Sequence, residues 1–147
     1  MSEVDRIADQ LKRAYEGKAW HGPGLLEVLS GVDEASARQR PIEGAHTIAE
    51  LVLHVVAWQD EAVRRLDGVG HDLAPKEDWP DTEGWVDVLS RLRASTERLL
   101  ARIERVDPSS LDDVLRDRED TVYRLLHGVV QHNLYHAGQI AILRKRG

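Results

Sequence analysis

The chain of 147 residues is long enough for one ordinary domain and too short for two, so we predict a single domain over residues 1–147. Hydrophobic residues make up 41% and charged residues 31%, a balance typical of a globular protein rather than a disordered one. The net charge of −6 argues against nucleic-acid and anionic-membrane partners, and the lack of cysteine excludes disulfides, thiolate metal sites and a cysteine nucleophile.

The N-terminal segment is polar and opens the first predicted helix. MSEVDRIADQ lacks the apolar core of a signal peptide, and no run along the chain approaches membrane-spanning length, so we expect a cytoplasmic protein. Aromatic residues that favour strands are scarce, whereas Leu, Ala, Glu and Arg abound, so we predict an all-α fold. The first helix is predicted over residues 3–16, with Ser2 as its N-cap and Gly17 at its end.

Three further helical segments are predicted before the last helix. A short helix should open at Pro23 and close at Gly31. The second long helix is predicted over residues 47–66, because Thr47-Ile48-Ala49-Glu50 has the spacing of a capping box. Residues 67–81 contain two glycines and two prolines and are predicted to form a loop. A third long helix is predicted over residues 82–106.

The last helix, predicted over residues 121–144, carries a pair of histidines. His132 and His136 are one turn apart and project from one edge of its apolar stripe. His54 occupies the same kind of edge on the second long helix, beside Trp58. Two imidazoles spaced in this way can bind one divalent metal, although ordinary core or surface histidines would have the same spacing. Together the long amphipathic helices predict a four-helix bundle.

Two segments carry a resemblance to a known family. ELVLHVVAWQDEAVRRL, and further along the chain VVQHNLYHAGQIAIL, resemble the DinB/YfiT-like family of metalloenzymes. WHGPGLLEVL is similar to one branch of that family, and the resemblance extends over nearly the whole chain. It implies a four-helix bundle in which a divalent metal is bound by His54, His132 and His136. Asn133 departs from the family pattern, in which an acidic residue is common at that position.

The resemblance also implies a class of activity. Members with assigned activities transfer low-molecular-weight thiols or isomerise a substrate with a thiol as cofactor, so the expected partners are a small-molecule thiol and an electrophilic substrate. Three neutral imidazoles would leave a divalent cation open to a further ligand, and a bound thiol would lose its proton. Zinc or nickel is the expected metal, and iron would also suit these ligands. The alternative is a non-catalytic metal-binding bundle with a structural or interaction role.

The remaining expectations concern the surroundings of the site and the assembly. Hydrogen-bond acceptors should orient the metal-binding imidazoles by contacting the ring nitrogen that does not face the metal. Glu50 and Glu61 lie on the same side of their helix as His54, and Gln139 lies on the same side as His132. The other four histidines are expected in loops or on the surface: His21, His46, His71 and His127. The habit of the family and four tryptophans in a chain of this size favour a homodimer.

Overall fold

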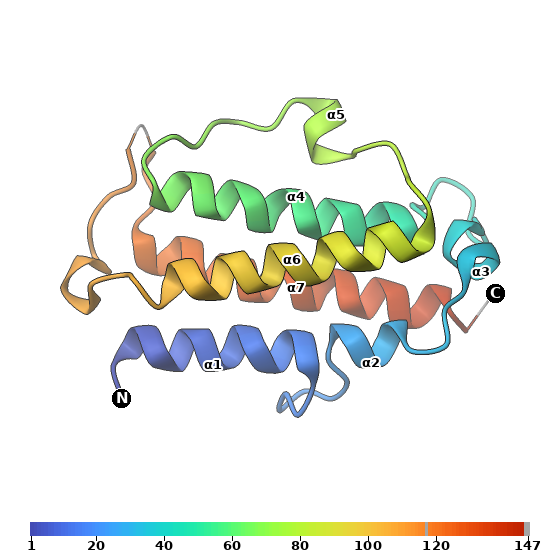
Figure 1. The fold of residues 1–147 in the computed structure, drawn as a ribbon, viewed down its shortest axis with the longest axis horizontal. Helices are drawn as coiled ribbons and strands as arrows, with labels where there is room; N and C mark the ends of the chain where they lie inside the picture. The colour runs from blue at the N-terminus through green and yellow to red at the C-terminus, as the bar shows by residue number, and fades with distance from the viewer. Residues whose placement is uncertain (117, 146–147) are drawn as a thin grey trace.

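Four long helices packed side by side form the body of the protein (Figure 1). The computed structural model describes residues 1–116 and 118–145, so residues 117 and 146–147 of the predicted domain lie outside the described residues. The predicted all-α class is confirmed, and α6 and α7 each pack against both α4 and α1. The long helices are α1 (Glu3–Glu16), α4 (Ile48–Leu66), α6 (Trp85–Ile103) and α7 (Val122–Leu143).

The N-termini of the long helices begin close to the predicted residues, except for α6. Ser2 and Thr47 cap α1 and α4, and the Thr47 hydroxyl accepts the Glu50 amide at 3.1 Å. The third long helix was predicted over 82–106 and is shorter at both ends. At its start, the Arg38 guanidinium donates to the Glu83 carbonyl at 2.7 Å and to Thr82, which holds these residues outside the helix.

Three short helices complete the chain. α2 (Leu25–Leu29) lies end to end with α1, and α3 (Glu34–Arg38) follows it (Figure 1). The stretch predicted as a loop at 67–81 contains a third, α5 (Pro75–Asp78), so that prediction was incomplete. Pro75 stands at the start of α5 and the Glu77 carboxylate accepts the Ala74 amide at 2.9 Å, which is enough to close one turn. A 3-10 turn covers Pro108–Ser110.

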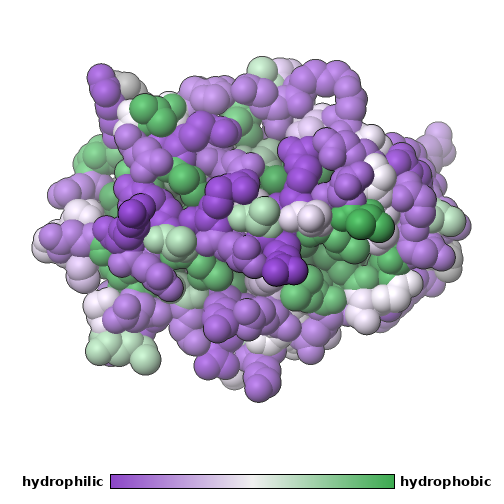
Figure 2. Space-filling model, viewed as in Figure 1, coloured by the Kyte–Doolittle hydropathy of each residue, from purple (hydrophilic) through white to green (hydrophobic). Residues whose placement is uncertain are grey.

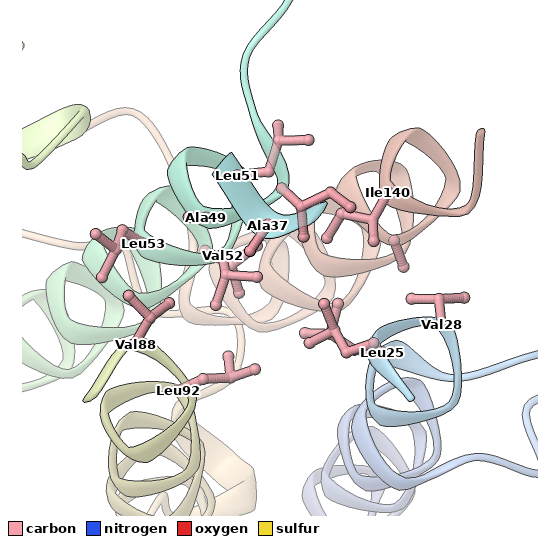
Figure 3. Packing of buried hydrophobic residues seen from close by; sticks show 14 of the residues in the cluster. Leu25, Val28, Ala37, Ala49, Leu51, Val52, Leu53, Val88, Leu92 and Ile140 are labelled. Atoms are coloured by element: carbon pink, nitrogen blue, oxygen red, sulfur yellow. The ribbon is translucent and has the colours of Figure 1, made fainter. Parts of the chain in front are cut away.

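The core consists of two apolar clusters with a polar layer between them. Figure 3 shows the first cluster, where α2, α3, α4, α6 and α7 contribute side chains such as Leu25, Ala37, Val52, Leu92 and Ile140. The second lies between α1 and the other ends of α4, α6 and α7. The polar layer is fully buried, and its hydrogen bonds join α4, α6 and α7 through Gln59, Ser95, Thr96 and Asn133.

The outer surface follows the amphipathic pattern of the helices. The face seen in Figure 2 is mostly hydrophilic, with smaller hydrophobic areas among the charged side chains. Within residues 1–116 and 118–145, no helix combines the length and the apolar character that crossing a bilayer requires.

Candidate metal centre

The structure brings the three predicted histidines together at the contact between α4 and α7. The Nε2 atom of His132 lies 3.1 Å from Nε2 of His54 and 3.1 Å from Nε2 of His136. His54 and His136 are buried and His132 is partly buried. Among the residues that the structure describes, these three form the one cluster of side chains that could hold a metal ion.

The opposite ring nitrogens show which atoms are free to bind a metal. Nδ1–H of His54 donates to the Asp78 carbonyl at 2.9 Å and lies 3.0 Å from Asp78 Oδ1. Nδ1–H of His136 donates to Gln139 Oε1 at 2.6 Å. With the proton on Nδ1, the Nε2 atom of each of these two rings carries a lone pair that faces His132 Nε2. A neutral His132 has one ring proton, so it can donate to at most one of the two Nε2 atoms. A divalent cation would satisfy all three nitrogens, so the residues fit a metal ion.

The residues that orient the imidazoles differ from the prediction. Glu50 and Glu61 were predicted to orient His54, and neither does. Glu50 accepts from Thr47 and Arg40. Glu61 accepts from two arginines and a backbone amide near the end of α4. Gln139 contacts His136 rather than His132, because a spacing of three residues aligns them on one helix face.

Asp78 has the role predicted for those glutamates. It reaches His54 from the end of α5, and its Oδ1 also accepts Trp58 Nε1–H at 2.7 Å. Nothing in the helical spacing of the sequence could indicate it, because Asp78 lies in another element, 24 residues after His54.

Aromatic rings cover one side of the centre. The Trp79 ring stacks on His54 with centroids 3.9 Å apart and on His46 with centroids 3.5 Å apart. His46 was expected in a loop or on the surface, and it is exposed there while also taking part in this stack. The segment around α5 therefore both orients His54 and shields it from water.

Burial favours the neutral form of His132 and His136. Desolvation, together with the neighbouring His136 and His54, lowers the pKa of His132 from 6.5 to about 3. Desolvation also lowers the pKa of His136, while the hydrogen bond that His136 donates to Gln139 raises it. Neutral imidazole is the form that binds metal, so His132 and His136 are ready for a cation at neutral pH.

The depressed pKa values predict how metal-stripped protein responds to acid. Below pH 6.5 the unfolded chain protonates His132 while the folded chain does not, so stability should fall as pH falls from 6.5 to about 3. One titrating group can change the free energy of unfolding by at most about 1.4 kcal/mol per pH unit. Urea unfolding at a series of pH values would measure it, and the slope should be smaller in His132→Gln but unchanged in His21→Ala. Equal slopes in all three proteins would contradict the prediction.

Removal of the Asp78 carboxylate should weaken metal binding. In Asp78→Ala the backbone carbonyl still accepts from His54, but the bond that joins His54 and Trp58 through Oδ1 is lost. Loss of such a partner typically weakens metal affinity by about 10- to 100-fold. A competitive titration against a chelating dye would measure the change. Asp81→Ala, which removes an 87% exposed carboxylate from the same segment, is the matched control and should bind metal as the wild type does.

A cavity of about 780 Å³ adjoins the three imidazoles. Apolar and aromatic side chains of α4 and α7 form much of its wall, together with Gly128, whose missing side chain leaves open space. His127 was expected at the surface but lines this cavity, and its Nε2 is buried without a hydrogen-bond partner. The size is typical of a small-molecule site.

The fold and the site define a class of protein. This is a helical bundle in which three buried or partly buried histidines, on the wall of a cavity, could hold a metal ion. The chain belongs to the DinB superfamily, whose family model matches residues 19–140 and so includes all three histidines. The resemblance seen in the sequence is thereby confirmed. No curated protein and no solved structure matches the chain significantly.

Proposed function

We propose that this protein is a metal-dependent enzyme that transfers or uses a low-molecular-weight thiol, as a thiol S-transferase or a thiol-dependent isomerase. His54, His132 and His136 are the proposed ligands of a divalent ion, with zinc or nickel favoured by three imidazoles. The observation that carries the proposal is the meeting of three Nε2 atoms on the wall of a cavity of small-molecule size. A purely structural metal site is normally closed by four protein ligands, whereas this one has three.

The side chains around the centre have separate tasks in this proposal. A bound divalent cation supplies Lewis acidity that lowers the pKa of a thiol beside it. Asp78 and Gln139 fix the ring orientations of His54 and His136. Trp79 shields the first of these rings from water. The chain has no cysteine, so the attacking sulfur belongs to the substrate.

The partners proposed are a small thiol and an electrophile, with no nucleic acid and no membrane. The negative net charge supports the exclusion of nucleic acid. A cytoplasmic location and a homodimeric assembly complete the proposal.

A screen of small thiols against a fluorogenic electrophile tests the enzyme proposal. Metal-loaded protein should accelerate the reaction with at least one thiol, metal-stripped protein should not, and added metal should restore the rate. If the stripped protein is as active as the loaded one, the proposed role of the metal is wrong. If neither preparation exceeds buffer with any thiol, the non-catalytic metal-binding bundle becomes the better description.

A further inference from the structure

Arg65 lines the cavity with hydrogen-bond donors that no protein group uses. It lies near the end of α4, and its side chain is only 13% exposed. Nε–H donates to Glu61 Oε1 at 3.0 Å, while its Nη atoms have no acceptor within residues 1–116 and 118–145. A guanidinium has five N–H donors, and only one of those of Arg65 is used by Glu61. The Nη donors of Arg65 are therefore available to a ligand in the cavity.

The surrounding contacts hold this guanidinium in place. Glu61 is fully buried, and besides Arg65 it accepts from Arg64 Nε at 2.9 Å and from the His71 amide at 2.7 Å. Gly70 packs so closely that a Cβ there would overlap the Arg65 side chain. Arg64 and Arg65 share the carboxylate of Glu61, so Arg65 does not have this acceptor to itself. The shared acceptor and the fixed geometry together favour an anionic ligand at the remaining donors of Arg65.

Arg65 and two histidines of the cluster lie near the same indole ring, that of Trp58. The guanidinium carbon of Arg65 lies 5.3 Å from the centroid of the Trp58 ring. The same ring has its centroid 5.9 Å from that of His132 and 6.4 Å from that of His54. A molecule that crosses the face or edge of Trp58 can therefore approach both the guanidinium and the imidazoles.

The other charged side chains of the cavity wall already have partners. Arg124 pairs with Asp120 at 2.8 Å, and both of these side chains line the cavity. Asp78 is engaged by His54 and Trp58. Arg65 also pairs with Glu61, but only through Nε, so its Nη donors are the ones open to a ligand in the cavity.

We propose that Arg65 binds a carboxylate of the substrate through its Nη atoms, beside the Trp58 ring. This inference rests on the proposed function, because it assumes that the cavity holds the small-molecule substrate. It adds a substrate class: the molecule that fills the cavity is a carboxylic acid. The planar fork of a guanidinium matches a carboxylate in two parallel hydrogen bonds, which selects an acid over its amide.

Calorimetric titration of the protein as purified tests this directly. The probes are the mercaptoalkanoates from mercaptoacetate to mercaptohexanoate, each compared with its own uncharged amide. At least one acid should bind more tightly than its amide by about tenfold or more, the usual range for a charge-assisted pair. In Arg65→Gln this preference should disappear, and in Arg65→Lys it should be reduced.

Arg64→Gln is the matched control, because it also removes a donor from Glu61 but does not line the cavity. It should keep the preference for the acid. If no acid in the series binds wild-type protein more tightly than its amide, the proposal is wrong even where the variants fail to fold. It is also wrong if folded Arg65→Gln keeps the full preference. These binding results do not depend on turnover, so they are separate from the test of the metal-dependent reaction.

Discussion

Purified protein is expected to carry one divalent ion per chain, and His132→Ala essentially none. His132 Nε2 lies 3.1 Å from each of the other two Nε2 atoms, so its loss removes the central one of the three proposed ligands. Two remaining ligands leave the ion poorly coordinated. We expect affinity to fall by more than about 100-fold, the upper end of what loss of an orienting partner costs. Elemental analysis after dialysis measures the metal content.

The control for this experiment is another histidine substitution. His71 lies outside the cluster, and its ring pairs with Glu77 at 3.1 Å. His71→Ala should therefore keep the metal content of the wild type. Equal metal content in His132→Ala and wild-type protein would show that these histidines are not the ligands.

Glu61→Ala should destabilise the fold by about 3–5 kcal/mol, the usual cost of breaking a buried ion pair from one side. The Glu61 side chain is fully buried, and its loss leaves the largely buried Arg65 without its carboxylate and the His71 amide without its acceptor. Urea unfolding followed by circular dichroism gives the change in the free energy of unfolding.

An exposed glutamate provides the comparison. Glu97 pairs with Arg93 on α6, and both side chains are largely exposed. Glu97→Ala should change the free energy of unfolding by no more than about 0.5 kcal/mol. If the two glutamate variants lose the same stability, the buried cluster around Glu61 does not have the role that its contacts indicate.

The sequence predicted the long helices well because their signals are local. Apolar spacing and the caps at Ser2 and Thr47 are read within a few residues of each helix start. The start of α6 was predicted too early because Arg38, in another element, binds residues 82 and 83. The sequence around residues 82 and 83 gives no local signal of such a contact with a distant residue.

The same distinction applies to the candidate site. His132 and His136 share a helix face, and the family resemblance added His54, so all three could be named before the structure was known. Asp78, Trp79 and Arg65 could not, because their positions depend on how the segment around α5 and the end of α4 meet the other helices. Helix periodicity shows which side of its own helix a residue faces, but not which residue of another element it meets.

The buried polar layer has a consequence for the order in which the protein folds and takes up metal. Gln59 bonds to Asn133 at 3.0 Å and to Thr96 at 3.1 Å, so sliding one helix past another by a turn would leave several buried amides and hydroxyls unpaired. His132 is the neighbour of Asn133, so the hydrogen bonds that set the helix register also bring His132 opposite His54. We therefore expect the apoprotein to fold first and to present its three histidines already in place, unlike small zinc domains that need the ion in order to fold.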